Sequence, residues 1–115
     1  MLIPKQPKPI SSPKHLAWIR SLWCVACGVM GCDAHHLLRC PGRRGQSRSG
    51  DEYALPICAV DHRPTFDGSL HSNGDETAWF KLKGILDPVG LATALWENTG
   101  DIQAANDLIL HGRAA

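Results

Sequence analysis

Apolar residues recur at the spacing of an amphipathic helix near the start of the chain and in three stretches near its end. The first stretch predicts a helix over residues 13–22, with Ser12 as its N-cap and Pro13 at the first helical position. The apolar face of this helix would consist of Leu16, Ile19 and Leu22 or Trp23.

The three later stretches each follow an aspartate that can cap a helix: Asp75, Asp87 and Asp101. Each predicted helix begins at the next residue, and the first of them is expected to run to about Lys83. Glycines close the other two; they are Gly100 and Gly112. The side chains expected in the core are Trp79, Phe80 and Leu82, then Leu91, Leu95 and Trp96, and finally Ala105, Leu108 and Ile109.

The middle of the chain has shorter, extended segments. A strand is predicted over 34–38 and another over 53–57, separated by a basic loop over 40–51 that is rich in Gly and Ser. A short helix should follow the second strand and end before Pro64, and residues 65–74 are expected to form a loop. Two short strands flanked by helices predict an α+β fold.

Composition limits the class of protein. A chain of 115 residues provides one small domain, and 43% hydrophobic residues with a formal net charge of +1 exclude a collagen-like or wholly disordered chain. No apolar stretch reaches the length of about 18 residues that a membrane helix needs. The start, Met1 to Ile10, has no apolar segment, so we expect no secretory signal, a cytoplasmic location and no membrane partner.

Basic residues are concentrated in the first fifty positions. Residues 1–12, with prolines between lysines, are expected to form an extended basic arm, and residues 13–115 a single domain with C-terminal helices. The basic side chains before residue 50 include Lys5, Lys8, Lys14, Arg20, Arg39, Arg43, Arg44 and Arg48.

Five cysteines in a chain without a secretory signal favour metal binding over disulfides. Cys24-x-x-Cys27 has the spacing of a zinc knuckle, and Cys58 offers a third thiolate. If a helix begins at Cys58, Asp61 and His62 lie on the same face as that thiol. Either of them can therefore complete a four-ligand structural Zn²⁺ site. The other two cysteines, Cys32 and Cys40, are expected in the core or in a loop.

A pair of adjacent histidines, His35 and His36, lies on the first predicted strand. Neighbouring side chains on a strand point to opposite faces, so one imidazole can bind a metal while the other transfers a proton. Two further histidines, His62 and His71, follow in a polar segment. The remaining two lie at helix edges, where a structural role is expected; they are His15 and His111.

The order of these motifs resembles that of the HNH endonucleases. In sequence, the chain has Cys24-x-x-Cys27, Ala34-His35-His36, a Gly/Arg loop, Leu55-Pro56-Ile57-Cys58, His62, and His71-x-x-Gly74-x-Glu76. The branch it resembles has a zinc knuckle, occurs in phages and prophages, and is similar to the recombination-enhancement, RecA-dependent nucleases. The tail from Trp79 to Glu97 also resembles short HNH proteins of bacteria and their prophages, so the resemblance covers about residues 14–101.

The resemblance implies a small ββα-metal (His-Me finger) core with a structural zinc knuckle and flanking helices. It also implies a hydrolytic nuclease with one catalytic divalent cation, which would be Mg²⁺, Mn²⁺, Ni²⁺ or Zn²⁺. By the same resemblance, His36 is the general base and His35 and His62 hold the catalytic cation. His71 matches a later histidine near the site, and His71 or Asp67 would be a further ligand.

Phosphodiester hydrolysis also requires groups that contact phosphate. Arg63, beside His62, is the side chain expected at the scissile phosphate. The arginines of the basic loop either line the path of the nucleic acid or are solvated loop residues; they are Arg39, Arg43, Arg44 and Arg48.

The sequence departs from the family pattern at two points. Asp61 stands where the family usually has Cys or His, which leaves Asp61 and His62 as alternative zinc ligands. The middle Asn of the HNH signature is absent; Tyr53 lies near its place and Asp51 is close. A backbone carbonyl or another group must therefore orient the general base.

The function predicted is metal-dependent hydrolysis of DNA, with a recombinase filament or phage packaging proteins as further partners. The alternative is a non-catalytic zinc module that binds nucleic acid or a protein partner, and a third reading is a zinc-stabilised structural phage protein. A structural zinc site needs only four ligands, so the additional histidines favour the enzyme.

Overall fold

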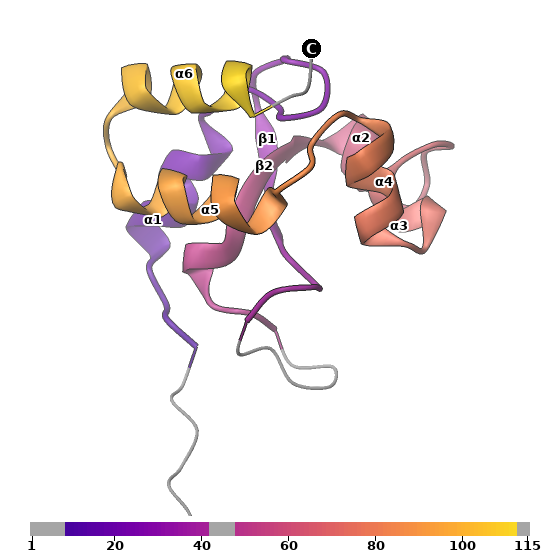
Figure 1. Ribbon diagram of the computed structural model, residues 1–115, viewed down its shortest axis with the longest axis horizontal. Helices are drawn as coiled ribbons and strands as arrows, with labels where there is room; N and C mark the ends of the chain where they lie inside the picture. The colour runs from indigo at the N-terminus through magenta and orange to yellow at the C-terminus, as the bar shows by residue number, and fades with distance from the viewer. Residues whose placement is uncertain (1–8, 42–47, 113–115) are drawn as a thin grey trace, which may run out of the picture.

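The computed structural model describes residues 9–41 and 48–112 and shows a small α+β fold (Figure 1). A two-stranded sheet lies among helices that precede and follow it in the chain. The elements, in order, are α1 (Pro13–Arg20), β1 (Cys32–His36), the 3₁₀ turn η1 (Asp51–Tyr53), β2 (Ala54–Cys58), α2 (Ala59–His62), α3 (Leu70–Asn73), α4 (Glu76–Leu82), α5 (Pro88–Glu97) and α6 (Ile102–His111).

The two strands are antiparallel. Their register pairs Cys32 with Cys58 and His35 with Leu55. Every residue of β2 is buried, and the turn of α2 begins directly where β2 ends, with Cys58 as its N-cap. The strand pair therefore brings the end of β2 beside the start of β1, where the cysteines lie.

The helices fall on two sides of the sheet (Figure 1). On one side, α1 and α5 contact the strands and η1, and α6 packs against α5; on the other, α2 contacts both strands and is followed by α3 and α4. The largest side chains buried in the core between them are Trp79, Phe80, Ile19, Leu22, Leu37, Leu55, Ile57, Leu70, Ile85, Leu95 and Ile109.

All four predicted helix caps are confirmed. The side chains of Ser12, Asp75, Asp87 and Asp101 each accept a hydrogen bond from the backbone N–H three residues later. Each such bond satisfies a backbone donor that the helix itself leaves unpaired, which stabilises the helix by about 1 kcal/mol.

Residues 65–74 are not wholly a loop as predicted, because they contain the one-turn helix α3. Ser69 caps its start by accepting from the N–H of Ser72, and Gly74 ends it in the left-handed conformation with φ of 81°. Four residues are too few to show an apolar periodicity, so only these capping residues indicate the helix in the sequence.

Other expectations need smaller corrections. The first helix ends at Arg20 rather than at residue 22. The first strand begins at Cys32 and ends at His36, two residues earlier than predicted. Leu82 is 77% exposed, not in the core, because α4 ends there and the chain reverses so that Ile85 is buried instead.

Two candidate metal centres

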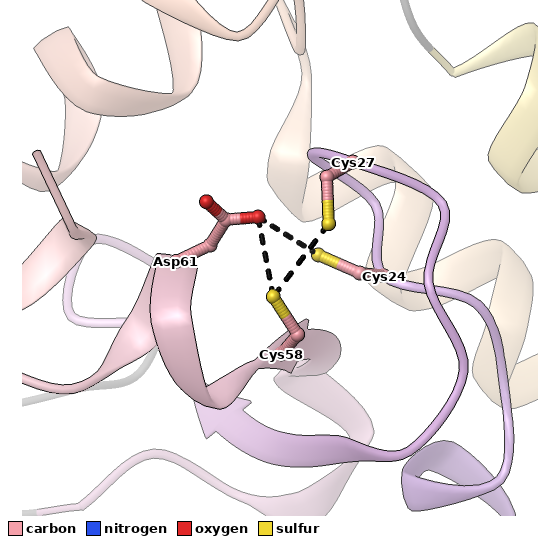
Figure 2. A group of neighbouring side chains, drawn as sticks. All are labelled: Cys24, Cys27, Cys58 and Asp61. Carbon is pink, nitrogen blue, oxygen red and sulfur yellow. Dashed lines mark hydrogen bonds between the residues drawn. The ribbon is translucent and has the colours of Figure 1, made fainter. Parts of the chain in front are cut away.

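Three thiols and a carboxylate meet where the turn that carries Cys24 and Cys27 lies beside the end of β2 and α2 (Figure 2). We call Cys24, Cys27, Cys58 and Asp61 the cysteine cluster. The Sγ atoms of Cys27 and Cys58 are 3.6 Å apart, and Asp61 Oδ2 lies 3.3 Å from Cys58 Sγ and 3.5 Å from Cys24 Sγ. All four side chains point toward one centre.

The turn that carries Cys24 and Cys27 is fixed by its backbone. The N–H of Cys24 donates to the carbonyl of Val29, and the N–H of Gly28 donates back to the carbonyl of Cys24. Gly28 has a φ of 82°, a left-handed conformation that favours glycine. The N–H of Ala26 points at Cys24 Sγ at 3.4 Å, so the turn directs a backbone donor at the thiolate.

These distances fit a tetrahedral ion. With Zn–S bonds of about 2.3 Å, tetrahedral zinc holds two sulfurs about 3.8 Å apart. Hydrogen bonding from the Cys32 side chain lowers the pKa of Cys24 to about 5, against the effect of burial, whereas burial raises the pKa of Cys27 to about 12. The spacing of its four donors lets the cysteine cluster hold a metal ion such as zinc, which takes thiols as thiolates.

A second group of donors is formed by three imidazoles, His35 on β1, His62 on α2 and His71 on α3, which we call the histidine cluster. His62 Nε2 lies 3.1 Å from His35 Nδ1 and 3.1 Å from His71 Nε2. His35 is 2% exposed, whereas His71 is exposed. The histidine cluster is thus buried on one side and open to solvent on the other.

Two carboxylates contact this cluster from behind. Glu76 Oε1 accepts from His35 Nε2 at 2.5 Å, and Asp33 Oδ2 accepts from His62 Nδ1 at 3.0 Å. Glu76 is itself buried and also accepts from the backbone N–H groups of Leu38 and Arg39. Burial would raise the pKa of Glu76, but these hydrogen bonds, the one from His35 first, lower it on balance.

These bonds determine which ring nitrogens are bare. Burial lowers the pKa of both His35 and His62, which keeps the two rings neutral near pH 7. A neutral ring carries one proton, and each ring donates it to its carboxylate. His35 Nδ1 and His62 Nε2 therefore face each other at 3.1 Å with lone pairs and no proton between them. Two lone pairs at this distance repel each other unless a cation lies between them, so the donor set fits a metal ion.

Asp61 and His62, the two alternative partners of the thiols, lie in different groups of donors. Asp61 lies with the thiols, and His62 lies with the other histidines. The two residues are neighbours on the single turn of α2. This short helix therefore contributes a donor to each cluster.

His36 is not one of the donors of the histidine cluster; it follows His35 on β1 and is paired with a different group. Its Nε2 lies 2.7 Å from Oδ1 of Asp51, a carboxylate that is 1% exposed. Asp51 Oδ2 accepts from the backbone N–H of Ser12 at 2.6 Å. The group that orients His36 is thus a carboxylate on η1 rather than a backbone carbonyl.

The arginines lie in different settings. Arg63 is exposed and donates through Nε and Nη2 to both oxygens of Asp33, each at 3.0 Å. These bonds are the main reason that the pKa of Asp33 falls to about 2. Arg39 is exposed beside a cavity of about 780 Å³ that Glu76 also lines, and Arg48 lies 3.7 Å from Asp51.

Three other predictions concern single residues or pairs of residues. Arg43 and Arg44 lie outside the described residues. Asp67 is exposed and is not among the donors of the histidine cluster in the described part of the chain. Cys32 is buried behind Cys24, as expected of a core residue.

Sequence reasoning did not assign a role to Asp33 or Glu76. Asp33 could have been found, because residues two apart on a strand share a face and Asp33 is two positions from His35. Glu76 was part of the quoted motif, but its contact with His35 spans 41 residues and depends on how α4 packs against β1.

Comparison with known protein families matches most of the chain. The model of a family described as Protein of unknown function (DUF968) matches residues 1–84, a range that includes every donor of both clusters. No curated protein and no solved structure matches the chain. Among the described residues, no helix is long and apolar enough to cross a membrane.

Proposed function

The chain belongs to the DUF968 family, and we propose that it is a metal-dependent endonuclease of the HNH type that hydrolyses DNA. The observation that carries the proposal is the contact of 3.1 Å between His35 Nδ1 and His62 Nε2, with Glu76 and Asp33 bound to the other nitrogens of the two rings. Carboxylates behind metal-binding histidines fix the ring and its tautomer, and two of the three imidazoles have one. His71 is the third ligand, on the open side.

The succession of β1, β2 and α2 supports the same proposal, because it has the order of a ββα-metal core. In this core the strands carry His35 and His36, and α2 carries His62. The cysteine cluster binds a structural Zn²⁺ next to it, with Asp61 as the fourth ligand. Four protein ligands close a zinc site, whereas three leave positions for water and substrate.

The chain's own residues supply the proton transfer. His36 is the general base: with Nε2 occupied by Asp51, it takes the proton of the attacking water at Nδ1. Imidazole is the side chain most often used as a general base. When bound by the histidine cluster, a divalent cation supplies Lewis-acid stabilisation for the charge that develops on the phosphate and the leaving oxygen.

Arg63 contributes positive charge beside this centre. Asp33 holds two of its nitrogens, which leaves Nη1 outside that pair to donate to a phosphate oxygen. Arg39 lines the neighbouring cavity and is the described loop arginine best placed to meet the nucleic acid backbone. Arg48 is less suited to contact the nucleic acid backbone, because its Nη2 lies 3.7 Å from Asp51 Oδ1.

The test is a nicking assay on supercoiled plasmid with the purified protein in Mg²⁺, Mn²⁺, Ni²⁺ or Zn²⁺. We expect cleavage that depends on added metal and that falls by about 10² to 10⁴-fold in His36→Ala, the usual contribution of a general base. His111→Ala, which changes an exposed histidine at the end of α6, is the matched control and should cleave normally. Wild-type protein that contains zinc but cleaves with none of these metals would contradict the proposal and favour a non-catalytic zinc module.

A further inference from the structure

The hydrogen bond between His36 and Asp51 determines the orientation of the His36 ring and also which of its nitrogens carries the proton. Asp51 is almost completely buried, and each of its carboxylate oxygens accepts a separate hydrogen bond. Oδ1 lies 2.7 Å from His36 Nε2, and Oδ2 lies 2.6 Å from the N–H of Ser12. Burial would raise the pKa of Asp51, but the hydrogen bonds from Ser12 and His36 lower it on balance, so the carboxylate is ionised.

An ionised carboxylate only accepts hydrogen bonds, so the nitrogen that faces it must carry a proton. In a neutral His36 the proton is therefore on Nε2, and Nδ1 has the free lone pair. Of the two neutral tautomers, only this one presents a basic nitrogen away from Asp51. The partner of the ring thus decides which nitrogen can accept a proton.

We propose that Asp51 is a positioning residue that fixes His36 as the Nε2–H tautomer, and that Ile10 and Ser12 hold Asp51 in place. This inference rests on the proposed function in one respect: it takes Nδ1 of His36 to be the atom that accepts the proton of the attacking water. It does not depend on which cation the histidine cluster binds, because the carboxylate of Asp51 makes its hydrogen bonds to Ser12 and His36 and, within the described residues, none to a member of that cluster.

The segment before α1 supports the carboxylate with two backbone contacts. The N–H of Ser12 donates to Oδ2 of Asp51, and the N–H of Asp51 donates in turn to the carbonyl of Ile10 at 2.9 Å. Ser12 is also the N-cap of α1, so its backbone is fixed on both sides. Residues 9–12, expected from the sequence to belong to an extended arm, therefore lie against the group that orients His36.

Asp51→Asn is the decisive variant, because asparagine has the same shape but one acceptor and one donor in place of two acceptors. The N–H of Ser12 can only donate, so the Asn oxygen should stay with Ser12. The Asn NH₂ group then faces His36 Nε2 and donates to it. This arrangement requires Nε2 to be bare and moves the ring proton to Nδ1, which removes the lone pair that the base needs.

The tautomer is measured by ¹⁵N NMR of the histidine side chains in the full chain at about pH 8.5, where histidines are neutral. His36 is assigned by the signal that is lost in His36→Gln. We expect the Nε2–H tautomer in the wild type and the Nδ1–H tautomer in Asp51→Asn. Asp101→Asn makes the same chemical change at the exposed cap of α6 and should leave the His36 signal unchanged.

Kinetics provide the second measurement. In Asp51→Asn we expect kcat for cleavage to fall by about 10² to 10⁴-fold, as for loss of a general base, while the affinity for Mn²⁺ by calorimetry is unchanged. A wild-type His36 that is protonated on Nδ1 would overturn the inference even if Asp51→Asn does not fold. An unchanged tautomer in folded Asp51→Asn would overturn it as well. If the tautomer switches in Asp51→Asn but neither this variant nor the wild type cleaves DNA, the result would support the role of Asp51 and contradict the nuclease proposal.

Discussion

The cysteine cluster and the histidine cluster are neighbours on α2, yet they differ in the number of their donors, in the type of donor atom and in exposure to solvent. The cysteine cluster has four donors from the protein, three of them thiols that contact one another or Asp61. The histidine cluster has three nitrogen donors, two of which have a carboxylate behind them, and its third member is exposed. A complete shell of three thiolates and a carboxylate suits a structural ion, and an incomplete shell of imidazoles suits an ion that must also hold water and substrate.

The comparison also shows that the two clusters are not independent. Cys58 caps α2, Asp61 lies within it, and His62 is its last residue. A four-residue helix is too short to be stable by itself, so the contacts of Cys58 and Asp61 determine where His62 lies. We therefore expect the cysteine cluster to support the geometry of the histidine cluster, and not the reverse.

The largest effect is expected on breaking the cysteine cluster. Binding of structural zinc to small domains is worth about 10–16 kcal/mol and is coupled to their folding. Cys58→Ser should therefore lose zinc, unfold much of the N-terminal half and abolish cleavage. Elemental analysis and thermal unfolding measure this, with Cys40→Ser as the control thiol outside the cluster. Wild-type protein that is folded but contains no zinc when purified without chelator would contradict a structural role of zinc in this cluster.

The next effect separates a metal ligand from the base. His35→Ala should weaken binding of the catalytic cation, so that raising the metal concentration partly restores cleavage. His36→Ala should lose about 10² to 10⁴-fold at every metal concentration, because extra cation does not replace a proton acceptor. Zinc content and DNA affinity should be close to wild type in both. If both variants respond to metal in the same way, the division of roles between the adjacent histidines is wrong.

A smaller effect is expected behind the histidine cluster. Loss of the carboxylate partner of a metal-binding histidine typically costs about 10- to 100-fold in metal affinity. Glu76→Gln should have this effect on Mn²⁺ binding by calorimetry, because an amide that keeps its contacts with Leu38 and Arg39 no longer fixes the tautomer of His35. Glu97→Gln, at an exposed position at the end of α5, is the matched control. Loss of zinc in Glu76→Gln would show that the two clusters are coupled in both directions.

How well each cluster can be predicted from the sequence depends on how close its donors lie to one another along the chain. The thiols and Asp61 stand in two short segments, and their spacing alone predicts a shared metal. The spacing could not choose between Asp61 and His62, since both lie on the Cys58 face of a helix. The choice depends on where β1 places His35, which is a property of the packed sheet.

The partners of the histidines were harder to predict because they are distant in sequence. Glu76 reaches His35 only after α3 and α4 have folded back over the end of the sheet, and α3 itself has no periodicity to reveal it. Asp51 was noted only as a residue near the position of the missing Asn; its burial and its bond to Ser12 depend on how α1 and η1 pack. The helices α1, α4, α5 and α6, in contrast, were predictable because each has a capping side chain and an apolar face.

The smallest effect concerns Arg63, which belongs to the open side of the histidine cluster. Its two bonds to Asp33 are exposed, so they add little to stability, and Arg63→Ala should leave thermal unfolding nearly unchanged. If Arg63 contacts one phosphate, the variant should bind DNA more weakly for all sequences and lower the slope of log K against log salt by about 1. Arg20→Ala, an exposed arginine at the end of α1, is the control with the same loss of charge. An equal change of slope in both variants would mean that Arg63 acts only through the net charge of the protein, and that the open side of the histidine cluster does not meet the scissile phosphate.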